Sequence, residues 1–282
     1  MVNKLDKIKG KIKVGKPKIS LGRLPYYFKI WVFMSKNSFL MVLTRKKLFF
    51  MFLLGKILKF IFFGLFLYFI VTGSGELAGY SVEQIIFFFL TFNIVDVFGQ
   101  FFYREVYRFR PILISGEFDL VLTKPMSSLF RILMGGSDVI DLVTIPLLLA
   151  AVIFVGSSFN PDPLQIILYI LLIINAMIIA TAFHIAVASL AIITLEIDHS
   201  IMIYRDILDL GKLPVDIYKE PLRSILTFVL PVGIMITLPG RVLMGLASPA
   251  GIIASFVVAA IVIFVAFKLW NIALKYYTSA SS

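Results

Sequence analysis

Six long apolar runs alternate with short clusters of charged residues, and this pattern constrains the fold more than any motif does. A helix needs about 20 apolar residues to cross a bilayer, because inside lipid every backbone N–H and C=O must be paired within the segment. Hydrophobic residues make up 60% of the 282 residues, whereas charged residues make up only 15%. The sequence therefore predicts an all-α polytopic membrane protein with six transmembrane helices.

The predicted spans differ in length. The fourth run is longer than one straight crossing, so its helix either tilts or projects from the membrane. The fifth run starts at Ile225 and meets Pro239-Gly240 before it can cross about 30 Å of hydrocarbon. Pro231 and Pro239-Gly240 are two predicted interruptions of this run. We expect the helix to break near the outer leaflet, at Pro239-Gly240, with a simple proline kink as the alternative. The spans are expected over residues 57–72, 85–102, 133–155, 164–195, from 225 onward, and 252–269.

The cations set the predicted orientation, because short loops rich in Lys and Arg stay cytoplasmic. With both termini in the cytoplasm, all of the 27 Lys and Arg residues except Arg241 lie in or beside inner segments. The sequence thus predicts a multi-pass protein of the plasma membrane, with cytoplasmic loops at 104–131 and 196–223. The net charge of +11 does not indicate a nucleic-acid partner, since the lysines flank membrane spans.

The part of the chain before the first span divides into two segments. Residues 1–24 form a basic stretch that we expect to be a cytosolic tail. Residues 25–47 mix aromatic residues with lysines, which suits an interfacial amphipathic helix in the headgroup plane, in contact with membrane lipids. A poorly formed extra span is the alternative. The six-helix transmembrane domain is then expected over residues 48–282.

A short punctuated segment, residues 116–125 (GEFDLVLTKP), lies between the second and third runs. Gly116 can end the preceding helix and Pro125 disfavours helix just before it, which leaves room for about two turns. On such a helix Phe118, Val121 and Leu122 share one face, at i, i+3 and i+4. This face suits packing against the membrane bundle.

Leu120 points the other way on that predicted helix, among residues of both charges. A soluble partner can grip such a surface, since an apolar anchor supplies most of the binding energy and charges at the rim set the register. An ordinary surface turn is the alternative. The candidate coupling residues are Gly116, Glu117, Phe118, Asp119, Leu120, Lys124 and Pro125.

Several polar residues fall inside the predicted spans, where each needs an explanation. Asp96 alone opposes insertion by about 3 kcal/mol. It forms one helical stripe with Asn93 and Gln100, and the third span carries Asp138 and Asp141. Two interpretations remain open for these five residues. They hold helices together by hydrogen bonds, or they line a transport pathway.

Two motifs and the order of the elements carry a family resemblance. The first motif is the 116–125 segment after the second span, and the second is 213–223 (LPVDIYKEPLR) before Leu230-Pro-Val232. With the interfacial helix and six spans, they resemble permeases of the type-2 class of ABC exporters, the ABC-2 family, and most of all its daunorubicin-type subgroup. The resemblance implies a transmembrane subunit that docks separate ABC ATPase subunits and pairs with a second copy or a sister permease.

Other functions find less support in the sequence. The resemblance implies that the chain is not itself an enzyme and holds no cofactor, because ATP and Mg²⁺ belong to the partner ATPase. Gly10-x4-Gly15-Lys16 has the Walker A spacing, but Pro17 replaces the Ser or Thr that would hold Mg²⁺. An intramembrane enzyme would need a catalytic dyad or metal ligands, and the chain has only two histidines. A secondary transporter or channel working without an ATPase is the remaining alternative.

Overall fold

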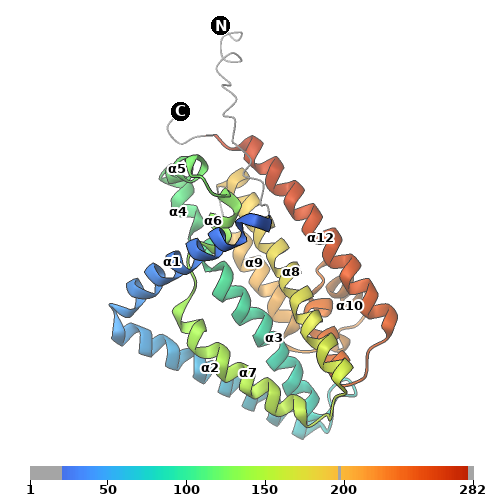
Figure 1. Ribbon diagram of the computed structural model, residues 1–282. Coiled ribbons are helices and arrows are strands. Elements are labelled where there is room, and N and C mark those ends of the chain that lie inside the picture. Colours follow the sequence, from blue (N-terminus) through green and yellow to red (C-terminus); the bar gives the residue numbers. More distant parts are fainter. Residues whose placement is uncertain (1–20, 196–197, 279–282) are drawn as a thin grey trace.

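The computed structural model describes residues 21–195 and 198–278, and helices make up most of this part of the chain (Figure 1). These residues form no β-strand, which confirms the all-α prediction. The basic tail up to residue 20 and its Walker-like sequence lie outside the described residues. The α-helices are α1 (Leu24–Leu43), α2 (Lys46–Ser74), α3 (Val82–Tyr103), α4 (Phe109–Ile114), α5 (Glu117–Thr123), α6 (Ser128–Met134), α7 (Val139–Ser157), α8 (Pro163–Thr194), α9 (Asp198–Asp209), α10 (Leu222–Ser224), α11 (Leu238–Leu243) and α12 (Pro249–Tyr276).

Five of the described helices are long and apolar enough to cross a membrane. They are α2, α3 with its continuation to Ile114, α7, α8 and α12. A sixth crossing would come from the pair Leu222–Val229 and Gly233–Leu243, whose halves are bent by 74°. The described chain is therefore a polytopic membrane protein with five continuous spans and one broken element.

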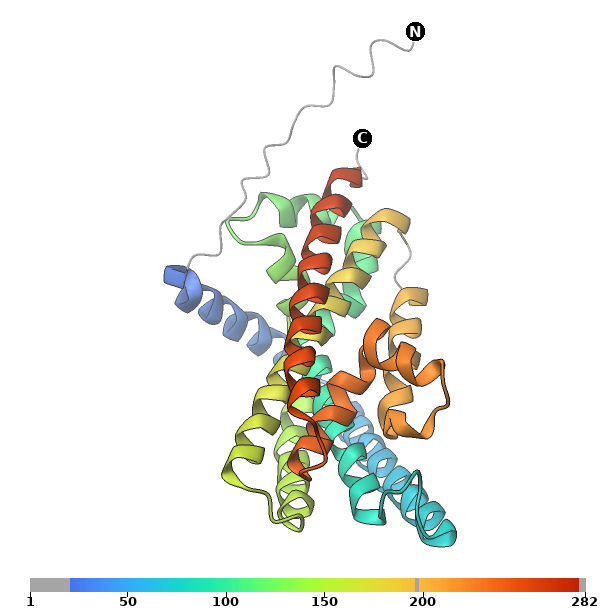
Figure 2. The ribbon, with the colours of Figure 1, turned by 90° about the vertical axis from the view of Figure 1, so that its right-hand side faces the viewer.

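The bundle has two ends (Figures 1 and 2). One holds α4, α5, α6 and the last turns of α12, and we call it the α5 end. The opposite end holds the α2–α3 and α7–α8 connections. The 32 residues of α8 extend about 48 Å at 1.5 Å per residue, more than the hydrocarbon thickness of about 30 Å. As the sequence predicted, α8 is longer than one straight crossing.

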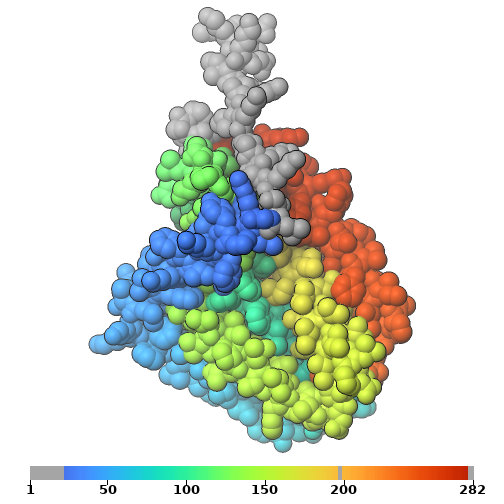
Figure 3. Space-filling model, viewed as in Figure 1, coloured from blue at the N-terminus to red at the C-terminus, as the bar shows by residue number. Residues whose placement is uncertain are grey.

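The helix α1 lies across the bundle rather than along it, and a turn at Thr44-Arg45 joins it to α2 (Figure 1). In the space-filling view α1 and α2 cover one side of the molecule and α12 covers the other (Figure 3). The helix expected over 25–47 ends at Leu43, because Lys46 and Lys47 already belong to α2. The interfacial position of α1 stays a prediction.

The third span begins later than predicted. Residues 133–155 were expected to form one helix, but α6 and α7 are separated by residues 135–138, which begin with Gly135 and Gly136. Gly135 lies so close to Glu105 that a Cβ there would come within 2.7 Å of the Glu105 Cγ. The loop expected over 104–131 is largely helical, since it contains α4, α5 and most of α6.

The fifth span breaks at the first of its two predicted interruptions, and not at the second. The bend falls at 230–232, around Pro231, whereas Pro239 lies in the first turn of α11, where a missing N–H costs little. Gly240 has a packing role instead, because a Cβ there would lie 2.7 Å from Phe88 Cδ1. The predicted interruption at Pro231 is therefore confirmed, and the predicted break at Pro239-Gly240 is wrong.

Part of the loop expected over 196–223 also lies elsewhere. The Lys212 ammonium lies 5.8 Å from the centre of the Phe92 ring on α3. Further along, Asp216 accepts a hydrogen bond of 2.8 Å from the hydroxyl of Tyr80, which lies two residues before α3. The chain thus runs beside α3 toward the opposite end, so residues 212–216 do not form a loop at the α5 end. A stretch rich in charged residues and proline has the composition of a loop. Here its Lys212 and Asp216 side chains interact with residues in and just before α3 instead.

Candidate functional site

The 116–125 segment forms a short helix with defined limits at the α5 end. Gly116 has φ of 76°, a left-handed conformation that suits glycine and separates α4 from α5. The seven residues of α5 make about two turns, and Lys124 then adopts an extended conformation before Pro125. The length agrees with the two turns predicted from the sequence.

One face of α5 packs into the protein and the other faces outward. Phe118 is fully buried, with ring centroids 5.2 Å from Phe109 and 4.9 Å from Tyr277. Val121 is buried too, whereas the Leu120 side chain is 64% exposed. The helical spacing predicted both faces. Burial of Phe118 fixes the helix, so Leu120 is presented on a rigid support.

Side-chain hydrogen bonds tie the segment to two distant helices. The Tyr277 hydroxyl, just beyond α12, donates to Asp119 Oδ1 at 3.0 Å. On the other side, the Tyr26 hydroxyl of α1 donates to the Pro125 carbonyl at 3.4 Å, and Tyr27 accepts from the Ser127 N–H at 3.2 Å. Asp119 therefore anchors α5, a role that sequence reasoning missed because Tyr277 is remote in the chain.

The electrostatics of this anchor favour a neutral tyrosine. Burial and the adjacent Asp119 carboxylate raise the pKa of Tyr277 to about 12, so its hydroxyl keeps its proton and donates. Glu117 and Lys124 are exposed on the same segment as Leu120. The outward surface of α5 thus has an apolar centre with one charge of each sign beside it, an arrangement that can hold a soluble partner in register.

Asp141, one of the predicted intramembrane residues, forms an ion pair across two helices. Its carboxylate on α7 accepts from the Lys56 ammonium on α2. Asp141 is 1% exposed and Lys56 is 17% exposed. Hydrogen bonding between helices was one of the two predicted roles, and Asp141 makes such a contact. Its other oxygen, Oδ2, has no partner among the described residues.

The stripe predicted on α3 divides in two. Asn93 donates to the Phe89 carbonyl of its own helix at 2.7 Å, so it does not bridge helices. Gln100 donates to Asp96 at 2.7 Å, and both line a cavity of about 340 Å³ between α2 and α3. Arg205 of α9 also lines this cavity, close enough to Asp96 for an electrostatic interaction.

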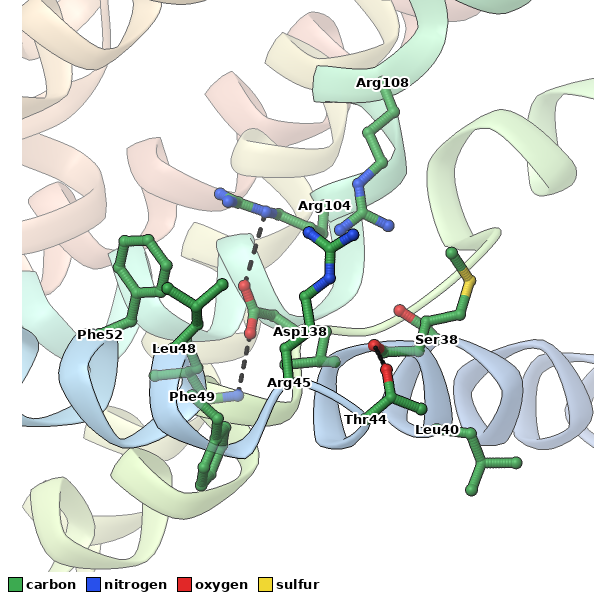
Figure 4. Close-up of a pocket in the computed structure, with 13 residues that line it drawn as sticks. Ser38, Leu40, Thr44, Arg45, Leu48, Phe49, Phe52, Arg104, Arg108 and Asp138 are labelled. Atoms are coloured by element: carbon green, nitrogen blue, oxygen red, sulfur yellow. Dashed lines mark hydrogen bonds and ion pairs between the residues drawn. The ribbon is translucent and has the colours of Figure 1, made fainter.

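Asp138 lies outside the helix that the sequence placed it in. It precedes α7 as the N-cap, where its carboxylate accepts from the Ile140 N–H at 2.9 Å. It also lies 3.5 Å from Arg104 Nε (Figure 4). The cavity of about 340 Å³ between α2 and α3 is therefore lined by Asp96, Gln100 and Asp138. Asn93 and Asp141 do not line it.

The sequence did not predict that lysines of α2 lie close to the intramembrane polar residues. Lys56 and Lys59 line the same 340 Å³ cavity, together with Arg104 and Arg205. The span expected over 57–72 places both lysines at its cytoplasmic start, outside any site. Helix α2 begins at Lys46, so Lys56 lies well inside it. The apolar residues before Lys56 were the available signal that the helix starts earlier.

The intramembrane histidine has structural partners. His184 is 2% exposed, and its Nδ1 lies 2.7 Å from the Ala180 carbonyl. Its ring lies 4.7 Å from that of Tyr103 and 4.9 Å from that of Tyr204. Within residues 21–195 and 198–278 no group of three or more His, Cys, Asp and Glu residues is placed to hold a metal ion.

Comparison with known proteins gives one kind of match. The family model described as "ABC-2 family transporter protein" matches residues 54–281, which covers most of the chain from α2 to α12. The searches of curated proteins and of solved structures returned no match.

Proposed function

Because the chain belongs to the ABC-2 family of transporter proteins, and so is the membrane component of an ABC transporter, we propose that it is the permease of an exporter driven by separate ATPase subunits. ATP and Mg²⁺ bind to those subunits, and this chain contributes the membrane path. A second copy or a sister permease completes the transporter. We place it in the plasma membrane, with both termini and the α5 end in the cytoplasm.

The proposal rests most on the exposure of Leu120 opposite the buried Phe118. A docking element must stay rigid on its own support and still offer an apolar anchor to the partner. The 116–125 segment has both properties, with Glu117 and Lys124 exposed on either side of Leu120. We assign the seven candidate coupling residues to this contact in two groups. Gly116, Phe118, Asp119 and Pro125 shape and anchor the segment, and Glu117, Leu120 and Lys124 face the ATPase.

Force on α5 would reach the bundle through its two anchors. Closure of the ATP-bound subunits pushes α5, Tyr277 passes the displacement to α12, and Tyr26 and Tyr27 pass it to α1. Coupling needs contacts that differ between two states of the bundle. Tilting of these helices then opens a route between the two permeases. A transporter or channel working alone would not depend on Leu120.

A docking test compares two leucines of nearly equal exposure at opposite ends of the molecule. Leu120 is 64% exposed on α5, and Leu164 is 65% exposed at the start of α8. Leu120→Glu places a charge at the proposed apolar anchor, so we expect the ATPase subunit to bind roughly 30-fold more weakly. Leu164→Glu should bind it normally. The chain is co-expressed with a candidate ABC ATPase subunit from the same organism, and the ATPase recovered with the purified chain is measured.

Equal recovery from both variants would contradict docking at α5. Phe118 is unsuitable for this test, because truncating a fully buried Phe to Ala costs about 3–5 kcal/mol and would unfold α5.

A further inference from the structure

A cavity of about 860 Å³ lies where α1 turns into α2, beside the end of α3 (Figure 4). Its lining includes three arginines, Arg45 at the turn and Arg104 and Arg108 just after α3. In Figure 4 the Arg45 and Arg108 guanidinium groups approach each other, while the Arg104 side chain extends past Asp138 and its guanidinium points away from them. Like charges repel, so three guanidinium groups around one cavity need anions to offset them.

Among the described residues one carboxylate lines this cavity, and it already has partners. Asp138 accepts from Ile140 and pairs with Arg104 at 3.5 Å. Arg108 lies 4.0 Å from Glu105, but Glu105 forms a closer ion pair, at 2.7 Å, with Arg131. The exposed Arg45 guanidinium has no hydrogen bond or ion pair within the described residues. The lining therefore carries two more positive charges than negative ones.

The rest of the cavity is apolar and continues onto the surface of α2. Leu48, Phe49 and Phe52 form its floor on α2, and Met41 of α1 is 74% exposed at its edge. Phe52 is 58% exposed, so the apolar lining is open toward the outer face of α2. A ligand that fits must therefore combine a compact anionic group with long apolar chains.

We propose that this cavity binds an anionic phospholipid, with its phosphate between Arg45 and Arg108 and its acyl chains along α2. Guanidinium groups bind phosphate oxygens through paired, charge-assisted hydrogen bonds. Basic pockets between membrane helices at the cytoplasmic surface suit such headgroups. The phospholipid would join the α1–α2 turn to the end of α3 and would offset the repulsion among the arginines. This binding does not depend on an ATPase partner, so it can be tested separately from the proposed function.

The test measures lipid binding to the purified full-length chain by native mass spectrometry in a neutral detergent. Phosphatidylglycerol and phosphatidylcholine with the same acyl chains are titrated, and phosphatidylglycerol should bind more tightly. The variant Arg45→Gln, Arg108→Gln should bind phosphatidylglycerol roughly 30-fold more weakly, because each basic residue contributes about fivefold. Arg45→Gln alone should weaken binding about fivefold. The exposed Arg45 side chain makes no hydrogen bond or ion pair within the described residues, so misfolding would not explain the weaker binding.

The matched control removes two charges at the same depth but outside the cavity. Lys46→Gln, Lys47→Gln lies next to Arg45 on α2 and should change binding by less than about twofold, since neither lysine lines the cavity. Equal weakening in this control would reduce the site to general surface attraction and overturn the proposal. Equal binding of the two lipids would also overturn it. Displacement of phosphatidylglycerol by millimolar inorganic phosphate would instead identify a site for a soluble anion.

Discussion

Tyr277 and Asp119, which are 158 positions apart, are joined by a hydrogen bond of 3.0 Å between the end of the last membrane helix and the short helix α5. The Tyr277 ring also packs edge-on against Phe118. Tyr277 therefore holds two successive residues of α5, Phe118 through its ring and Asp119 through its hydroxyl. In the proposed mechanism this contact is the route by which a push on α5 displaces α12.

Replacing Tyr277 with Phe should loosen α5 without unpacking it. The variant keeps the ring and loses only the hydroxyl, at a cost of about 1 kcal/mol. We expect the backbone amides of α5 to exchange with solvent about fivefold faster, measured by hydrogen–deuterium exchange. Tyr276→Phe is the control, because the neighbouring Tyr276 is 68% exposed. Unchanged exchange in Tyr277→Phe would show that the hydroxyl does not restrain α5.

The same contact predicts a pH dependence. The pKa of Tyr277 is raised by burial and by Asp119 to about 12, above the value near 10 of an unfolded tyrosine. A raised pKa stabilises the folded state below pH 10, and this contribution is lost as the pH rises from about 10 to 12. The exchange rates of wild type and Tyr277→Phe should therefore differ by a constant factor between about pH 6 and 9. A ratio that changes within this range would contradict the assignment.

The buried ion pair between Lys56 and Asp141 predicts that replacing one partner destabilises the protein more than replacing both. Asp141→Leu leaves the Lys56 ammonium unpaired inside the bundle, so we expect a loss of about 3–5 kcal/mol in the free energy of unfolding. The joint variant Lys56→Met, Asp141→Leu removes both charges and should recover most of that loss. Thermal unfolding in detergent and abundance in the membrane measure the two effects.

The outcome for this pair also separates the two roles predicted for the polar residues. A joint variant that is as unstable as Asp141→Leu would mean that Asp141 is not held chiefly by Lys56. A joint variant of normal abundance whose transport is lost would place the pair on the transport pathway rather than in helix packing.

Features that depend on neighbouring residues in the chain were predictable from the sequence. The opposite faces of Phe118 and Leu120 follow from 3.6 residues per turn, and the limits of α5 follow from Gly116 and Pro125. Apolar length likewise predicted the membrane helices. These signals are local. The structure confirms the helices, although α2 begins at Lys46 rather than 57 and α7 begins at Val139 rather than 133.

Features that depend on distant partners were not predictable in the same way. Asp216 pairs with Tyr80, 136 positions away, and this contact brings a polar, proline-rich stretch beside α3. The same residues in isolation have the composition of a loop. Lys56 pairs with Asp141, 85 positions away in the chain. Without knowledge of this partner, the charge of Lys56 indicates the boundary of a span. Local hydropathy cannot distinguish a charge in water from a charge that is paired inside the bundle.

The packing of Gly240 against Phe88 predicts an asymmetry between two glycines. A Cβ at Gly240 would come 2.7 Å from the Phe88 ring, so Gly240→Ala should destabilise the protein by about 1–3 kcal/mol. A Cβ at Gly64 on α2 would meet no atom within 4 Å, and Gly64→Ala should be neutral or stabilising by up to about 1 kcal/mol. Melting temperatures of the two variants compare them directly, and equal shifts would contradict the close approach of α11 to α3.

The central claim is that the 116–125 segment faces the compartment that holds the ATPase. The chain has no cysteine, so Leu120→Cys and Leu164→Cys each introduce a single thiol, at opposite ends of the bundle. The measurement is labelling with a membrane-impermeant maleimide in cells that express the chain without its ATPase. We predict that intact cells label Leu164→Cys, and that Leu120→Cys is labelled only after the membrane is opened. Labelling of Leu120→Cys in intact cells would place α5 on the outside and contradict the account.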